Sequence, residues 1–361
     1  MQPKGSPELE QELLTRETGH MQEETPWSSE RVIDCHFHER TNDEATIAHL
    51  DGAGITSALV LAFGDFRETY GRLREKEAGR IVGWARAPHF SKEDVYSDDP
   101  HREAFDMTET HRRAARGEAL STLAALKADG WKGFAETTGR VAVDSPELQC
   151  VYAISAELDV PVMMHFQEAE VPGQPVYGIK GFSRIGAMLE KFPATKFVCH
   201  APDFWGNIDS RYHDGGAYLS GPVARGGLSD RLLRDYPNMY GDLGAPSALL
   251  QLTRDLDFTA DFLERHREKL MFGSDCGCTD GRGGLAEGAQ RPTAPLAPAP
   301  KDQGVWIAST AAAMQTAMAS LGGLAGKCIG RELLSVTWRT TSRETFRRIA
   351  ADNAVRAYNL T

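Results

Sequence analysis

The chain has 361 residues, enough for one large domain or two ordinary ones. Its 40 Lys and Arg residues against 51 Asp and Glu residues give a formal net charge of −11, which argues against nucleic acid and anionic membranes as partners. Hydrophobic residues at 41% and charged residues at 25% exclude a wholly disordered, collagenous or coiled-coil chain. No apolar run approaches the ~18–20 residues that span a bilayer.

Residues 1–29 are polar and rich in Glu, Gln and Thr, and we expect a mobile tail, with an arm packed against the domain as the alternative. This stretch lacks the apolar core of a secretory signal. The six cysteines are too sparse for a disulfide scaffold, so we expect a cytoplasmic protein. Cys276 and Cys278 lack the spacing of a zinc knuckle, and no second pair complements them.

From residue 31 onward, short apolar runs rich in Val, Ile, Phe and Met alternate with longer amphipathic segments. Most runs are apolar on both faces, which is typical of parallel strands covered by helices. The predicted strands are 31–38, 55–63, 80–88, 130–136, 160–166, 196–202, 239–244 and 270–275. About eight alternations favour a (β/α)8 TIM barrel over a doubly wound sheet, because no Gly-rich phosphate loop follows the first strand.

Helix signals lie between these runs. Thr41 and Glu44 have the spacing of a capping box, and Ser145 is a predicted N-cap before a proline. The last helix is expected to start at Thr341, with Glu344 three residues later.

Residues 283–301 are rich in Gly, Ala and Pro, and an Ala- and Met-rich stretch follows at 307–320. Such composition favours extended chain. We interpret 283–322 as an insertion after the eighth strand, so that residues 30–361 form a single barrel domain.

The first predicted strand carries two histidines. Side chains alternate along a strand, so His36 and His38 share one face, and Cys35 and Phe37 share the other. If Cys35 and Phe37 face the helices, both imidazoles face the barrel axis at the carboxyl end of the strand, where such barrels keep their active sites. Two imidazoles at this spacing can chelate one divalent cation.

Later strands repeat the pattern. His165 ends the fifth, His200 the sixth and Asp275 the eighth. A single histidine in an apolar strand is usually a hydrogen-bonded core residue, but polar residues at successive strand ends point to function, because burying them unpaired is costly. Glu136 ends the fourth strand, and its role stays open: it could orient a metal ligand or bind the substrate. Asp242 is interpreted as a helix N-cap or loop anchor.

The D-x-H-x-H opening, the strand-end histidines and the G-S-D ending at Asp275 resemble the metal-dependent amidohydrolase superfamily. The resemblance covers residues 31–282 and 327–360, and is nearest to the branch that contains aminocarboxymuconate-semialdehyde decarboxylase and pyrone-dicarboxylate lactonase relatives. It implies a distorted TIM barrel. It assigns His200 to substrate polarisation or a second metal. It assigns the metal to four residues, which are His36, His38, His165 and Asp275.

The chain departs from the superfamily pattern in two places. Lys132 lies too early in its strand to be the usual lysine ligand, and Glu136 occupies the terminal position instead. The Pro/Ala-rich insertion after Asp275 is also foreign to the pattern. We expect one tightly bound Zn²⁺, with Mn²⁺ as the alternative, and Glu136 as a tentative ligand.

The predicted activity is hydrolysis of an amide, ester or lactone in a small substrate. A bound metal lowers the pKa of water to about 7, Asp275 takes the proton, and His200 polarises the carbonyl. Non-oxidative decarboxylation of an aromatic or unsaturated acid is the alternative. A catalytically silent barrel that acts as a binding protein is the second alternative.

The pocket lining is expected to include Trp205, Tyr212, His213 and Arg282. Aromatic rings with a cation suggest a flat substrate that bears a carboxylate, whereas loop packing explains Trp205 and Tyr212 equally well. We expect no nucleic-acid or membrane partner, and whether the protein is a homo-oligomer stays open.

Overall fold

Eight parallel strands form one sheet in chain order, which confirms the predicted (β/α)8 barrel. The computed structural model describes residues 25–40, 42–61, 66–77, 79–88, 109–169, 176–284 and 326–360. The strands are β1 (Ile33–Phe37), β2 (Ser57–Leu61), β3 (Ile81–Arg86), β4 (Trp131–Thr137), β5 (Pro161–His165), β6 (Lys196–His200), β7 (Met239–Asp242) and β8 (Leu270–Met271).

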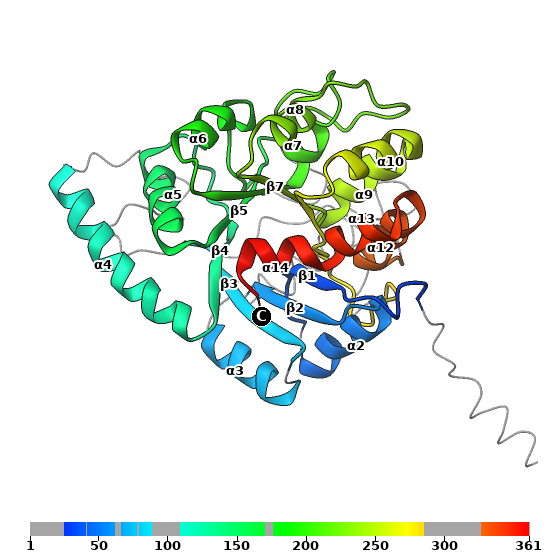
Figure 1. Cartoon of the computed structure of the whole chain (residues 1–361), viewed down its shortest axis with the longest axis horizontal. Helices are drawn as coiled ribbons and strands as arrows, with labels where there is room; N and C mark the ends of the chain where they lie inside the picture. The colour runs from blue at the N-terminus through cyan, green and yellow to red at the C-terminus, as the bar shows by residue number, and fades with distance from the viewer. Residues whose placement is uncertain are drawn as a thin grey trace, which may run out of the picture.

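Helices follow each strand and surround the sheet (Figure 1). They are α2 (Asp43–Ala53), α3 (Phe66–Lys76), α4 (Glu109–Ala128), α5 (Pro146–Leu158), α6 (Ile185–Lys191), α7 (Ala201–Gly206), α8 (Leu228–Asp235), α9 (Ala245–Thr253), α10 (Leu256–Arg265), α12 (Ile329–Thr340), α13 (Arg343–Arg347) and α14 (Asn353–Tyr358). A π-helical turn joins α13 to α14. Among the residues that the structure describes, no helix is long and apolar enough to cross a lipid bilayer.

The helix caps are partly those expected. Ser145 caps α5, as predicted. Asn42 rather than Thr41 caps α2, and Ser342 rather than Thr341 caps α13, each accepting a hydrogen bond from a backbone amide of the first turn. Both corrections are shifts of one residue, because neighbouring Thr, Asn and Ser residues all cap well.

The barrel closes through hydrogen bonds between its first strand and the segment after its last. The amide of Cys35 donates to the carbonyl of Phe272 over 3.0 Å, and the amide of Asp275 donates to the carbonyl of His36 over 2.9 Å. These bonds place Asp275 directly beside β1.

Alternate strand residues fill the barrel interior and form what we call the inner cluster, which α14 and its neighbours complete. Its buried members are Ile33, Cys35, Leu59, Leu61, Ala85, Ala135, Met163, Val198, Met271, Ala351, Ala354, Ala357, Tyr358 and Leu360. The C-terminal helix therefore closes one end of the barrel, and the polar strand ends lie at the other.

Strand β1 is irregular at its histidines. Asp34 pairs with Ala58 and Phe37 pairs with Val60, so three steps along β1 match two along β2. A bulge of this kind changes the phase of the side chains. Cys35 consequently belongs to the inner cluster, and Phe37 packs in the outer layer between strands and helices. Of the two residues supposed to face the helices, Phe37 does so and Cys35 does not.

Strand β4 has the same irregularity. Phe134 pairs with Val162 and Thr137 with Met164, again three steps against two. Phe134 packs in the outer layer, whereas Glu136 points the other way and contacts histidines of β5 and β6. The bulge therefore separates Glu136 from the face of Phe134, which residues two apart share in a regular strand.

Residues just before 30 pack against the domain, which agrees with the alternative interpretation of the predicted tail. Trp27, which the sequence placed in the tail, is 2% exposed and donates from Nε1 to the carbonyl of Ala53 over 3.2 Å. Its ring also lies 6.5 Å from that of Phe346. Residues 25–29 thus belong to the domain. The rest of the predicted tail and residues 285–322 of the predicted insertion lie outside the described residues.

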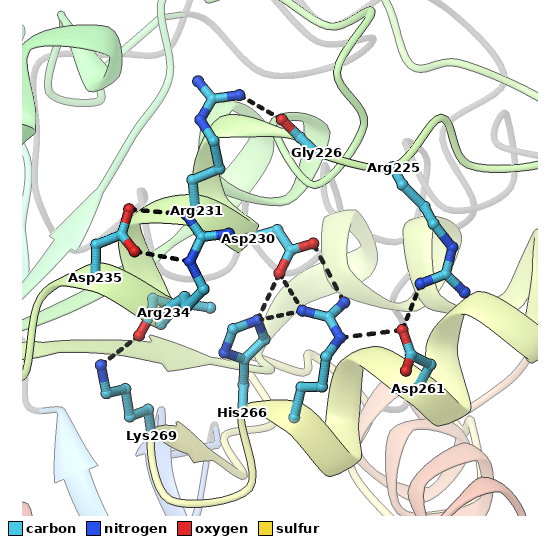
Figure 2. Close-up of polar contacts among 11 residues, drawn as sticks. Arg225, Gly226, Asp230, Arg231, Arg234, Asp235, Asp261, His266 and Lys269 are labelled. Atoms are coloured by element: carbon cyan, nitrogen blue, oxygen red, sulfur yellow. Dashed lines mark hydrogen bonds and ion pairs between the residues drawn. The ribbon is translucent and has the colours of Figure 1, made fainter.

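An ion-pair network joins α8 to α10 (Figure 2). Asp230 accepts hydrogen bonds from His266 Nε2 at 2.7 Å and from Arg265 Nη2 at 3.2 Å. Asp261 accepts from Arg265 Nε at 3.0 Å and from Arg225 at 2.6 Å. Burial raises the pKa of Asp230, but the hydrogen bonds from His266 and Arg265 outweigh it and lower that pKa to about 2. The network therefore depends on an ionised Asp230.

Candidate active site and metal centre

Histidine rings from three strands lie together at the carboxyl end of the barrel. The ring centroids of His36 and His38 are 5.2 Å apart, and those of His36 and His200 are 4.6 Å apart. The rings of His165 and His200 are separated by 4.8 Å. The structure thus brings together the strand-end histidines that the sequence singled out.

Two of these imidazoles are oriented by carboxylates. His36 Nδ1 lies 2.6 Å from Asp242 Oδ2, and His165 Nδ1 is hydrogen-bonded to Glu136 Oε1. Among the described residues, neither His36 Nε2 nor His165 Nε2 has a hydrogen-bond partner, although both atoms are buried. A carboxylate that holds one ring nitrogen and leaves the other facing inward is the arrangement seen at metal-ligating histidines.

His38 and Asp275 complete one corner of the site. The Nδ1 of His38 donates to the carbonyl of Leu61 over 3.2 Å, since a carbonyl can only accept. Oδ1 of Asp275 lies 3.5 Å from His38 Nε2 and 3.7 Å from His36 Nε2. Ligand atoms of a tetrahedral zinc ion are about 3.4 Å apart, given bonds of 2.0–2.2 Å. The two distances from Asp275 are therefore close to the edges of such a tetrahedron.

The remaining donors adjoin this corner. Potential ligand atoms within 4.8 Å of one another fall into three overlapping groups: His36, His38 and Glu136; His36, His200 and Asp275; and Glu136, His165 and His200. His165 is thus linked to the corner through Glu136 and His200 rather than directly. Glu136 Oε1 bonds both His165 and His200, so the tentative ligand lies at the centre of the predicted set.

The electrostatics of the site favour a bound cation. Burial lowers the pKa of His36, but Asp275 and Asp242 outweigh it and raise that pKa to about 10. Burial raises the pKa of Asp275 to about 7, and Glu136 adds to the effect. Burial also lowers the pKa of His200 to about 4, which keeps this ring neutral at pH 7. Carboxylates that hold a proton on a buried imidazole can hold a metal ion there instead.

Asp242 has a role that the sequence did not reveal. It was expected to be a helix N-cap or a loop anchor, but Gly244 is the N-cap of α9. Asp242 is fully buried and holds His36, while its second oxygen accepts from the Gly244 amide at 3.0 Å. The signal in the sequence was a carboxylate inside an apolar strand, which needs a partner when buried.

Trp205 and Tyr212 are both buried. Trp205 is fully buried in α7, and its Nε1 donates to the carbonyl of Asp242 over 3.0 Å. The Tyr212 hydroxyl donates to Asp203 at 2.9 Å. Loop packing, the alternative left open by the sequence, describes both contacts.

His213 and Arg282 are exposed. His213 borders a hollow of about 460 Å³ with Tyr212, Asp209 and Arg231, and none of the metal-site candidates lines it. Arg282 lies in the loop after β8, where its amide donates to Asp280 over 2.8 Å. The structure does not join either side chain to the histidine cluster.

The sequence matches no family model and no curated protein. Among solved structures, the chain is similar to an amidohydrolase from Burkholderia multivorans with bound zinc, at 14% identity and a TM-score of 0.46, over 92% of this chain and all of the other. A probable 2-pyrone-4,6-dicarboxylic acid hydrolase from Acinetobacter baumannii, with citric acid bound, is similar at 12% identity and a TM-score of 0.43, over 91% and 100% of the two chains.

A third similar structure is 5-carboxyvanillate decarboxylase from Novosphingobium aromaticivorans, complexed with manganese and 4-hydroxy-3-methoxy-5-nitrobenzoic acid. Identity is 11%, the TM-score is 0.41, and the match covers 93% of this chain and 98% of the other. At these scores the likeness itself decides no activity, and we infer function from the geometry of the site.

Proposed function

We propose that the protein is a metal-dependent hydrolase that cleaves an amide, ester or lactone bond in a small carboxylate-bearing substrate. One observation carries the proposal: a carboxylate holds Nδ1 of His36 and of His165, while Nε2 of each ring is buried and, among the described residues, has no hydrogen-bond partner. A divalent cation, Zn²⁺ or Mn²⁺, supplies a Lewis acid and water with a pKa near 7 when bound at such a site.

Asp275 is the proposed proton carrier. It is 3% exposed, and burial raises its pKa to about 7, so its carboxylate and acid forms are both accessible near neutrality. Its amide is bonded to the His36 carbonyl, which fixes the side chain beside the histidine pair. In hydrolysis, Asp275 accepts a proton from the attacking water and delivers it to the leaving group.

His200 and Glu136 act as a pair beside Asp275. The neutral His200 ring donates from Nε2 to Glu136, whose pKa the neighbouring His165 and His200 hold well below its usual range despite burial. His200 polarises a substrate oxygen through the same N–H once that oxygen displaces the Glu136 carboxylate. Glu136 then keeps its hydrogen bond to His165 and positions that ring.

Decarboxylation is the second candidate, because the pKa of Asp275 also permits its acid form to protonate a ring carbon. The test assays metal-loaded full-length protein with lactones and esters by proton release, and with aromatic acids by carbon dioxide release. Proton release that Asp275→Asn abolishes supports hydrolysis. Carbon dioxide release that the same variant abolishes indicates a decarboxylase, and metal binding without turnover in either panel indicates a binding protein.

A further inference from the structure

A second group of metal-competent side chains lies outside the active site. We call it the cysteine cluster: His49 on α2, Cys276 and Cys278 in the loop after β8, and Cys328 at the N-cap of α12. All four residues are buried, with exposed fractions of 2% or less. No second pair of cysteines accompanies Cys276 and Cys278 in the sequence, but the fold supplies the missing two donors from residues far away in the chain.

The separations within the cluster match tetrahedral coordination. Cys276 Sγ lies 3.5 Å from Cys278 Sγ and 3.8 Å from Cys328 Sγ. His49 Nδ1 lies 3.3 Å from Cys278 Sγ. With Zn–S bonds of about 2.3 Å and Zn–N bonds of about 2.0 Å, a tetrahedron has S–S edges of about 3.8 Å and S–N edges of about 3.5 Å.

Ordinary core packing explains this cluster poorly. Three thiols and an imidazole converge on one point from three separate segments, and all three cysteines are free of disulfide bonds. Arg40 is also buried there: its Nε donates to the Cys278 carbonyl over 2.7 Å, and its Nη1 donates to the His38 carbonyl. No carboxylate of the described residues forms an ion pair with it. Three thiolates around a divalent cation carry one net negative charge, which complements this guanidinium.

We propose that His49, Cys276, Cys278 and Cys328 bind one structural Zn²⁺ through Cys3His coordination. Four protein ligands close the coordination sphere, so the ion is structural rather than catalytic. It ties α2 and α12 to the loop that begins directly after Asp275, and it joins the chain on either side of residues 285–325. The ion therefore fixes the segment that carries the proposed proton carrier.

The test separates this site from the active site by disabling the latter. Full-length protein with both His36→Asn and Asp275→Asn is purified under reducing conditions, loaded with zinc, and analysed for metal content and zinc X-ray absorption. We expect one zinc per chain with sulfur neighbours at about 2.3 Å. Zinc with only nitrogen and oxygen neighbours, no retained zinc, or a disulfide within the cluster would overturn the proposal.

Ligand variants in the same background give the second measurement. Cys328→Ser and His49→Ala should lose the zinc and the sulfur signal, whereas His49→Cys should keep both, because it restores a fourth donor. Cys150→Ser, a half-buried cysteine of α5 outside the cluster, is the matched control and should keep the zinc. If a loss variant does not fold, chelating the zinc from the parent must lower its melting temperature, and an unchanged value contradicts a structural role.

Discussion

His36 Nδ1 and Asp242 Oδ2 are 2.6 Å apart, and both side chains are completely shielded from solvent. The contact joins β1 to β7 across the barrel end and turns His36 Nε2 toward Asp275. Asp242 thereby fixes both the tautomer and the direction of the imidazole.

We predict that Asp242→Asn weakens active-site metal binding by about 10- to 100-fold, since an amide can hold either His36 tautomer but supplies no negative charge. Competition of Mn²⁺ with a chromophoric chelator measures the affinity. Asp235→Asn, an exposed carboxylate on α8, is the control. Equal affinities for the two variants would mean that Asp242 only packs the barrel.

Asp275→Asn should lower turnover by about 10²–10⁴-fold with the fold intact, because the amide has a similar volume but cannot accept a proton. Near-ultraviolet circular dichroism checks the fold. A variant as active as the parent protein removes Asp275 from the reaction.

The wild-type protein should show a matching pH profile. The pKa of Asp275 is raised to about 7, so its proton-accepting form is lost as the pH falls through 7. A bound cation moves this limb to lower pH, and kcat should fall about tenfold per pH unit below it. A profile that stays flat down to pH 4 contradicts a role for Asp275 as proton acceptor.

Much of the site could be predicted because each strand-end residue is signalled locally. His165 and His200 each end an apolar strand whose side chains alternate in direction. Strands β5 and β6 pair without a bulge, so the faces of these two histidines follow from their spacing. The faces around His36 and Glu136 could not be predicted, since bulges in β1 and β4 reset the alternation. Nothing local to the sequence reports a bulge.

Partners from distant parts of the chain were also hidden. Asp242 meets His36 across 206 positions, and His49 meets Cys278 across 229. Such pairs depend on barrel closure, which places the segment after β8 beside β1. The role of Trp205 stayed open for a related reason: an aromatic residue just after a strand-end histidine can line the pocket or the outer layer, and only the path of α7 decides.

Asp230→Asn should destabilise the protein by about 2 kcal/mol at neutral pH, the value of a pKa lowered from 3.8 to about 2. A lowered carboxylate pKa gives stability that is fully present above pH 3.8 and is lost as the pH falls toward 2. The urea midpoints of variant and parent should therefore converge between these pH values. A constant difference down to pH 2 would show that the network of Figure 2 does not depend on ionised Asp230.

We expect one catalytic metal, with Glu136 as an orienting residue or weak ligand. Titration with Mn²⁺ reads this site separately from the cysteine cluster, since Mn²⁺ prefers oxygen and imidazole ligands to thiolates. Activity should saturate at one equivalent in both wild type and Glu136→Gln. A requirement for two equivalents that disappears in Glu136→Gln would show that Glu136 bridges a pair of ions.

The most direct test of the central claim is a crystal structure of the zinc-loaded protein with anomalous data at the zinc edge. We predict an anomalous peak about 2.0–2.2 Å from Nε2 of His36 and His38 and from a carboxylate oxygen of Asp275, with His165 turned toward the same ion. A map with no anomalous peak at this position, in which these histidines are hydrogen-bonded only to protein, would contradict a metal-dependent active site.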